Sequence, residues 1–253
     1  MSSPIWTPAA LRSECAAVRG RAWRLVEVQH TISTMKLVDG AAEQTVLEDI
    51  LEATKPSVPP ECAGLHYLLA TPFRYGSYPY GSRFRRAGLT PGVWYGAERV
   101  ATALAEMVFY RFLFYAEAPD VPWPVAPSEY TALAAEVEGE AVDLTRPPLS
   151  EDAATWTDPV RYDACQALAD SAREAGAGLI RYTSVRDPGG GANLAVLTCR
   201  AFSRPAPVSR QTWRIRLGAF GAFAISDSTP RRHDFARDAV EDPRLDGMVW
   251  ARG

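Results

Sequence analysis

The sequence predicts an α+β domain built around a mixed or antiparallel β-sheet. Helical patterns dominate the first 55 residues and return at residues 98–115 and 161–174, whereas β-rich runs follow one another after residue 178. Strands and helices therefore do not alternate as they would in a doubly wound parallel sheet. The chain of 253 residues is 47% hydrophobic and 23% charged, which is typical of a folded protein with its own core.

A helical segment at residues 1–60 is predicted to precede the main domain at residues 61–253. Thr7 and Pro8 are typical of a helix start, with Gly20 as terminator. Residues 23–40 are ambiguous between strand and helix, and residues 41–55 have apolar side chains at helical spacing. The sequence SVPPE at 57–61 is the expected junction.

The middle of the chain is predicted to contain a buried helix between two strand-rich regions. Residues 65–84 are expected to be a short strand that enters a shaped loop, residues 92–97 a strand, and the helix begins near Glu98. The proline-rich residues 119–127 form a connector, and residues 130–144 form one or two strands, with Gly139 at a turn or bulge.

The C-terminal third is predicted to be a helix followed by strands. Residues 161–174 are an amphipathic helix that glycines 176 and 178 end, and four β-rich runs follow, at 178–185, 193–199, 211–217 and 220–226. The triple glycine at 189–191 is a hairpin loop, because a strand follows it where a dinucleotide fingerprint needs a helix. The charged residues 229–247 are expected to be surface loop.

Charge and cysteine usage exclude several classes of protein. A net charge of −3 gives no basic field for nucleic acid, and no run approaches the ~18–20 apolar residues of a membrane helix. The cysteines and histidines are scattered singly, which argues against a metal site. We therefore expect a soluble, cytoplasmic protein whose cysteines are reduced core residues: Cys15, Cys62, Cys165 and Cys199.

Glu106 is the one charge in a helix that is otherwise apolar between Val100 and Tyr110. Such a helix is normally buried, and an ionised carboxylate is rarely buried alone, so Glu106 is expected to be either paired or functional. The prediction is that it shares one pocket with upstream arginines, namely Arg74, Arg83, Arg85 and Arg86. The alternative is a structural pair with Arg111 or Arg74, with Arg85 and Arg86 in solvent.

Ser184 and Arg186 are two residues apart in a predicted strand, so they are expected on the same side of it. Arginine binds phosphate through paired hydrogen bonds, aromatic rings stack on heterocycles, and a carboxylate stabilises a sugar cation. These residue types suit a site that holds a dinucleotide and breaks its glycosidic bond. Plain core, strand and turn roles for Tyr95, Ser184 and Arg186 are the alternative.

Three separated motifs, FRYGSYPYGSRFRRAG, GVWYGAERVATALAE and GLIRYTSVRDPGG, resemble in that order the RES-domain family, bacterial toxins of toxin–antitoxin systems. Residues 23–52 further resemble the leading segment of its ParT-like branch. The resemblance implies a fold like that of ADP-ribosyltransferases, NAD as the substrate and an antitoxin partner. Where this chain has Phe84-Arg85-Arg86, many relatives have Trp-Asn-Pro.

The resemblance also implies residue roles. The motif arginine falls on Arg83, with Arg74 as a second candidate, and both are expected to hold phosphate. The tyrosine falls on Tyr95, near the nicotinamide. The glutamate falls on Glu106, which is expected to bind the ribose and stabilise the cation, and the serine on Ser184, which orients either. Arg186 is a further candidate for binding NAD.

The leading hypothesis is a toxin that cleaves NAD and transfers ADP-ribose to a cellular protein, without a metal and without contacting nucleic acid or membrane. The helical N-terminal segment offers surface beyond what NAD requires, which favours a protein acceptor. The first alternative is a NAD glycohydrolase or phosphorylase that depletes NAD. The second is a non-catalytic binding module in which Glu106 and the arginines form a structural ion network.

Overall fold

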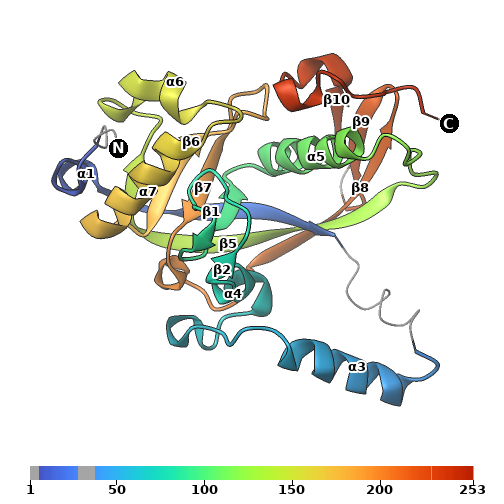
Figure 1. The fold of residues 1–253 in the computed structure, drawn as a ribbon, viewed down its shortest axis with the longest axis horizontal. Coiled ribbons are helices and arrows are strands. Elements are labelled where there is room, and N and C mark those ends of the chain that lie inside the picture. The colour runs from blue at the N-terminus through green and yellow to red at the C-terminus, as the bar shows by residue number, and fades with distance from the viewer. Residues whose placement is uncertain (1–5, 28–37, 229, 253) are drawn as a thin grey trace.

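The computed structural model describes residues 6–27, 38–228 and 230–252, and these form an α+β fold (Figure 1). The strands of the main sheet are β1 (Ala16–Glu27), β4 (Trp94–Ala97), β5 (Ser128–Asp143), β6 (Leu179–Thr183), β7 (Ala192–Val196), β8 (Ser209–Gly218), β9 (Gly221–Ser226) and β10 (Arg232–Ala236). A small second sheet pairs β2 (Ser77–Tyr78) with β3 (Gly88–Leu89). The α-helices are α1 (Pro8–Glu14), α3 (Ala41–Ala53), α4 (Tyr67–Arg74), α5 (Val100–Glu117), α6 (Ala153–Trp156) and α7 (Asp163–Ala175).

The main sheet is mixed and partly closed. Its strand order is β1-β4-β7-β6-β5-β8-β9-β10, and β1 also pairs with β5, so the first five strands of that order form a ring. The pair β5–β6 is parallel, and the other pairs of the main sheet are antiparallel. The predicted α+β class with a mixed sheet is confirmed.

Helix α5 is the buried helix that the sequence predicts. It lies beside the strands β8 and β9 (Figure 1), and Phe109 and Phe112 pack with Trp213 and Ile215 in one core cluster. Helix α7 packs through Leu168 and its neighbours in a second cluster, on the β6 side of the sheet. α7 ends at Gly176, whose φ of 90° is the left-handed conformation that glycine adopts most readily, as predicted.

The N-terminal segment corrects one prediction. Helix α1 starts at Pro8 with Thr7 as its cap, as expected, but it ends at Glu14, and Gly20 lies inside β1. β1 pairs with β5 at twelve successive positions, so this stretch belongs to the main sheet and is not part of a helical cap. The ambiguous run from residue 23 continues into residues 28–37, which lie outside the described residues.

Two further stretches differ from the predictions. Residues 67–74, expected as strand and loop, form α4, because His66 Nδ1 caps the helix by accepting the N–H of Leu68 and Phe73 packs inward from its last turn. The C-terminal residues expected as surface loop contribute the edge strand β10, and Asp242 and Leu245 beyond it are buried. No helix in the described ranges is long and apolar enough to cross a membrane.

Candidate functional site

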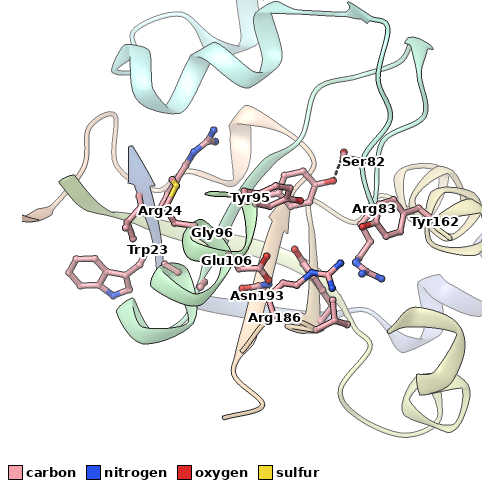
Figure 2. Close-up of a pocket in the computed structure, with 17 residues that line it drawn as sticks. Trp23, Arg24, Ser82, Arg83, Tyr95, Gly96, Glu106, Tyr162, Arg186 and Asn193 are labelled. Atoms are coloured by element: carbon pink, nitrogen blue, oxygen red, sulfur yellow. Dashed lines mark hydrogen bonds between the residues drawn. The ribbon is translucent and has the colours of Figure 1, made fainter. Parts of the chain in front are cut away.

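A cavity of about 320 Å³ lies between α5, the strands of the ring and the loop that precedes β4 (Figure 2). It contains one carboxylate, three arginines and four tyrosines, together with smaller polar and apolar groups. Its lining residues are Trp23, Arg24, Leu25, Ser82, Arg83, Tyr95, Gly96, Ala97, Ala103, Glu106, Met107, Tyr110, Tyr162, Tyr182, Val185, Arg186 and Asn193.

Glu106 reaches the cavity from α5 and is held through one of its two oxygens. Its Oε1 accepts hydrogen bonds from Ser184 Oγ at 2.7 Å and from Asn193 Nδ2 at 2.6 Å. Within the described residues no arginine pairs with it, since Arg111 pairs with Glu27. Two neutral donors therefore orient the carboxylate. Among residues 6–27, 38–228 and 230–252, no cation cancels its charge and no group binds Oε2, which can therefore bind a ligand.

Ser184 is itself fixed by the backbone that follows it. Its Oγ accepts the N–H groups of Arg186 at 3.2 Å and Asp187 at 3.1 Å, which leaves the hydroxyl hydrogen for Glu106. A serine that accepts two N–H groups in this way closes a tight local turn. The hydrogen bond to Glu106 is thus directed by the turn and not by a freely rotating side chain.

Asp187 connects the same turn to the start of α5 through a hydrogen bond and an ion pair. Its carboxylate accepts from Thr102 Oγ1 at 2.7 Å and pairs with Arg99 at 3.1 Å. A Cβ at Gly191 would collide with Thr102 and Asp187, so a glycine is needed for this close approach. The loop of residues 186–191, predicted as a hairpin turn, therefore sets the distance between Ser184 and Glu106.

Arg83 lies at one end of the cavity and has no carboxylate partner in the part of the chain that the structure describes. Its Nη1 donates to the carbonyl oxygen of Trp156 at 2.6 Å, and its guanidinium stacks 4.7 Å from the ring centre of Tyr162. The residue is only 7% exposed. A buried guanidinium whose charge is not cancelled favours an anionic ligand.

Arg24 lies on the opposite side of Glu106 and Tyr95 from Arg83 (Figure 2). It comes from β1, rests 5.6 Å from the ring centre of Trp94, and has no hydrogen bond or ion pair within the described residues. Loss of solvent lowers the pKa of Arg24 to about 10. The cavity thus has a free cation on each side of its carboxylate.

Tyr95 lines the cavity with a hydroxyl that is already bonded. Its oxygen accepts the N–H of Phe84 at 3.0 Å and lies 2.9 Å from Ser82 Oγ. Desolvation raises the pKa of Tyr95, so the phenol stays protonated. The contact ties the β4 strand to the loop that presents Arg83, while the ring remains available for packing against a ligand.

Arg186 lines the cavity, but a buried acid cancels its charge. Its Nη1 pairs with Asp242, and its Nη2 donates to Pro159 O at 2.7 Å. Arg244 binds the same carboxylate at 2.9 Å, and Asp242 is 4% exposed. Ser184 and Arg186 lie beyond the end of β6 at Thr183, so their predicted place in a strand is wrong. Arg186 lines the cavity but is mainly engaged in this buried triad, whereas Ser184 is not a lining residue and contacts Glu106 from behind it.

The other predicted arginines do not meet in the cavity. Arg74 pairs with Glu52 at 2.6 Å, and Arg86 pairs with Asp170 at 2.9 Å. Arg85 donates to the carbonyl of Tyr75. The expectation of a shared pocket is therefore wrong for these three residues, since α4 and the turn after it direct their side chains toward other partners.

Among the cavity residues that the sequence analysis did not single out are Arg24, Tyr182 and Asn193. Arg24 lies in a run whose secondary structure was ambiguous, so nothing placed it near Glu106. Tyr182 is two residues before Ser184, and the alternation argument that linked Ser184 with Arg186 would have included it. Asn193 is the one strongly polar residue at the start of an otherwise apolar strand, which is a usable signal.

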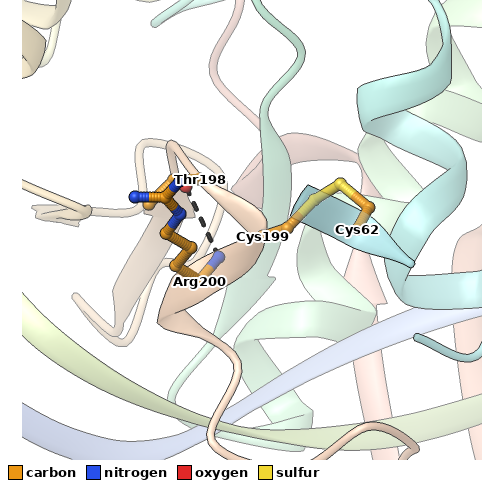
Figure 3. The surroundings of a disulfide bond; sticks show 4 residues. All are labelled: Cys62, Thr198, Cys199 and Arg200. Atoms are coloured by element: carbon orange, nitrogen blue, oxygen red, sulfur yellow. Dashed lines mark hydrogen bonds between the residues drawn. A yellow bond between two sulfur atoms is a disulfide. The ribbon is translucent and has the colours of Figure 1, made fainter. Parts of the chain in front are cut away.

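The cysteines correct another prediction. Cys62 and Cys199 form a disulfide that joins the stretch before α4 to the turn after β7, whereas Cys15 and Cys165 are free thiols (Figure 3). The expectation that all four are reduced is wrong for this pair, because the two residues are adjacent in the fold although 137 positions apart. Across the described ranges, no cluster of three or more His, Cys, Asp or Glu residues could hold a metal ion.

Comparisons with known proteins give one clear match. A family model described as the RES domain matches residues 58–218, more than half of the chain. No curated protein sequence matches it. Among solved structures, the chain is similar to the M. tuberculosis MbcT–MbcA toxin–antitoxin complex, with a TM-score of 0.46 and 12% identity over 79% of this chain and 90% of that chain. At these values the likeness supports no conclusion about function.

Proposed function

Since the chain belongs to the RES-domain family, we propose that it is the toxin of a toxin–antitoxin system that cleaves NAD and transfers ADP-ribose to a cellular protein. The observation that supports this most is the charge arrangement of the cavity. Across the described residues, Glu106 keeps an uncancelled charge and a free oxygen. The guanidinium groups of Arg24 and Arg83, which have no acidic partner in those same residues, lie on either side.

This arrangement suits a ligand that has two phosphates next to a sugar that becomes cationic. In the reaction the bond between the ribose C1′ and the nicotinamide nitrogen breaks, and nicotinamide leaves with the electron pair. The sugar then has oxocarbenium character, which a nearby carboxylate stabilises. An acceptor nucleophile bonds to C1′ and loses its proton. No metal is needed for these steps.

Each residue has a distinct part in this proposal. Glu106 binds the ribose and stabilises the cation, Ser184 and Asn193 orient Glu106, and Arg83 with Arg24 holds the diphosphate. Tyr95 offers its ring to the nicotinamide. Arg74, the second arginine predicted from the sequence, is left out of this list because it is engaged with Glu52.

The test is nicotinamide release from NAD by wild type and Glu106→Gln, which keeps the volume of the side chain and removes its charge. Wild type is expected to release nicotinamide and to arrest growth when produced without its antitoxin, and Glu106→Gln to do neither. Glu117→Gln, an exposed substitution at the end of the same helix, serves as the control and should behave as wild type. A fully active Glu106→Gln variant would contradict the assignment.

The acceptor is identified by repeating the assay with cell lysate, phosphate or buffer alone. Turnover that requires lysate and adds the mass of ADP-ribose to one protein supports transfer to a protein. Free ADP-ribose in buffer, or its phosphorylated form in phosphate, would replace that step with depletion of NAD. If calorimetry shows that NAD binds but no nicotinamide is released, the protein is a non-catalytic binding module.

A further inference from the structure

Four tyrosines line the cavity, and they differ in whether the hydroxyl group has a hydrogen-bond partner. Tyr95 is bonded to Ser82 and to a backbone N–H, and Tyr162 donates to a backbone carbonyl at 2.9 Å. Tyr110 is 57% exposed and can bind water. Tyr182 is 7% exposed, and its hydroxyl has no hydrogen-bond partner among the described residues.

Among the described residues, the hydroxyl oxygen of Tyr182 is not one of the fully buried polar atoms that lack a partner, so it is open to the cavity that the residue lines. The ring of Tyr182 packs edge-on against Phe84, with their centres 4.8 Å apart, and this contact does not require the oxygen. The core therefore gains nothing from the hydroxyl. A hydroxyl that no protein group binds and that opens into a ligand cavity is expected to bind the ligand.

Tyr182 also lies next to the residues that hold Glu106. It is paired with Asn193 in the β6–β7 register, and Asn193 donates to Glu106. Ser184, the other donor to Glu106, is two residues further along the same segment. Desolvation, with the charge of Glu106 second, raises the pKa of Tyr182 well above its usual value, so the phenol remains a hydrogen-bond donor.

Glu106 as a carboxylate can only accept hydrogen bonds, whereas the phenol of Tyr182 can donate one. A ligand hydroxyl satisfies both, because it donates its hydrogen to a carboxylate and accepts with its oxygen. We propose that Tyr182 binds substrate by donating to a hydroxyl of the nicotinamide ribose that in turn donates to Glu106 Oε2. This inference rests on the proposed function and adds to it a second binding residue for the sugar.

The consequence is a preference for substrates whose sugar carries that hydroxyl. A NAD analogue with hydrogen in place of the 2′-hydroxyl of the nicotinamide ribose, and one without the 3′-hydroxyl, are the probes. Wild type is expected to bind one of the two more weakly than NAD. The same analogue should bind Tyr182→Phe about as well as NAD does, because the variant lacks the donor that distinguishes them.

The experiment compares Tyr182→Phe with wild type and with Tyr115→Phe, a tyrosine of similar burial in α5 that does not line the cavity. Tyr182→Phe is expected to lower kcat/KM for NAD by about 10- to 100-fold and to leave Tm unchanged or slightly higher. Tyr115→Phe should keep wild-type kcat/KM. A lower kcat/KM without a lower Tm separates substrate binding from a structural role, which would lower both.

Failure of the inference about Tyr182 can be distinguished from failure of the proposed function. If Glu106→Gln is inactive while Tyr182→Phe has the kcat/KM of wild type, the inference about Tyr182 is wrong and the proposed function stands. If Tyr182→Phe loses activity only in proportion to a lower Tm, the hydroxyl is structural and the inference is again wrong. If wild type neither binds nor cleaves NAD, both fail together.

Discussion

Ser184 donates its hydroxyl hydrogen to Glu106 Oε1 at 2.7 Å while its oxygen accepts two backbone N–H groups of its own turn. The hydroxyl therefore has one possible direction for its hydrogen. This fixes the carboxylate of α5 against the loop after β6, two elements whose residues are 78 positions apart. The other carboxylate oxygen of Glu106 has no partner in the described ranges and can bind a substrate.

Ser184→Ala is expected to lower kcat for nicotinamide release by about 10- to 100-fold, because Glu106 loses one of its two donors and the turn loses both of its side-chain acceptor contacts. Asn193 still holds Glu106, so the loss should be smaller than in Glu106→Gln. Steady-state kinetics with NAD measure kcat for Ser184→Ala and for Glu106→Gln. Ser203→Ala, on the exposed stretch after β7, is the control. Equal activity of Ser184→Ala and wild type would show that the contact has no catalytic use.

Arg24→Ala is expected to raise KM for NAD by at least about tenfold with little change in Tm. In the proposed function its guanidinium binds a phosphate, and among the described residues the side chain has no hydrogen bond or ion pair to lose beside its contact with the Trp94 ring. Arg21→Ala is a matched control on the same strand, where the side chain is 59% exposed and lies 3.7 Å from Glu136. Added salt should weaken NAD binding less in Arg24→Ala than in wild type. An unchanged KM would remove Arg24 from the binding site.

The Cys62–Cys199 disulfide closes a loop of 137 positions and should stabilise the fold by about 2–5 kcal/mol. The double variant Cys62→Ser/Cys199→Ser is therefore expected to unfold at a lower denaturant concentration than wild type. Wild type in reductant should approach the variant, whereas reductant should leave the variant itself unchanged. Cys15→Ser, which alters a free thiol, controls for the loss of a sulfur. Coincident unfolding curves for wild type with and without reductant would argue against the bond.

Asp242 should contribute stability that depends on pH. Burial by itself raises the pKa of Asp242, but hydrogen bonds from Arg244 and the charges of Arg186 and Arg244 outweigh it and hold the pKa below its usual range. The contribution of Asp242 to the free energy of unfolding is therefore fully present above the pKa of an unfolded aspartate, about 3.9. It is lost as pH falls through the lower pKa of Asp242 in the folded protein.

Asp242→Asn is accordingly expected to destabilise the protein by about 3–5 kcal/mol at pH 7, since it leaves two arginines without their counter-charge. The difference from wild type should shrink in urea unfolding at acid pH, below the folded pKa. Asp246→Asn, an exposed acid on the same segment, should unfold as wild type does at both pH values. If wild type and Asp242→Asn differ in unfolding free energy by the same amount at both pH values, the ionised carboxylate is not the source of the effect.

The sequence was most informative where a single residue broke a strong pattern. One charge in an apolar helix identified Glu106, and the glycine pair after residue 175 located the end of α7. Ser184, singled out in the segment after Thr183, donates to Glu106, although it lies in a turn and not in the predicted strand. These signals are local, so no knowledge of the fold was required. The motif resemblance supplied Arg83 and Tyr95, which also line the cavity. The likeness to the ParT-like branch stays a prediction.

The errors have a common physical origin. Arg74, Arg85 and Arg86 are near Arg83 along the chain, but α4 and the following turn give each a different direction and a different partner. Arg24 is far away in sequence and reaches the cavity only through strand pairing. The disulfide likewise depends on tertiary proximity, because single cysteines 137 positions apart carry no local sign of their partner.

The pairing of β1 with β5 has a consequence for the order of events during synthesis. These strands bring residues 16–27 against residues 130–141, a contact that requires closing a chain of more than 100 residues. The cavity further requires Asn193, on β7. A nascent chain that leaves the ribosome from its N-terminus therefore acquires its pocket only after most of its length is available. The chain would therefore lack its complete pocket until late in its own translation.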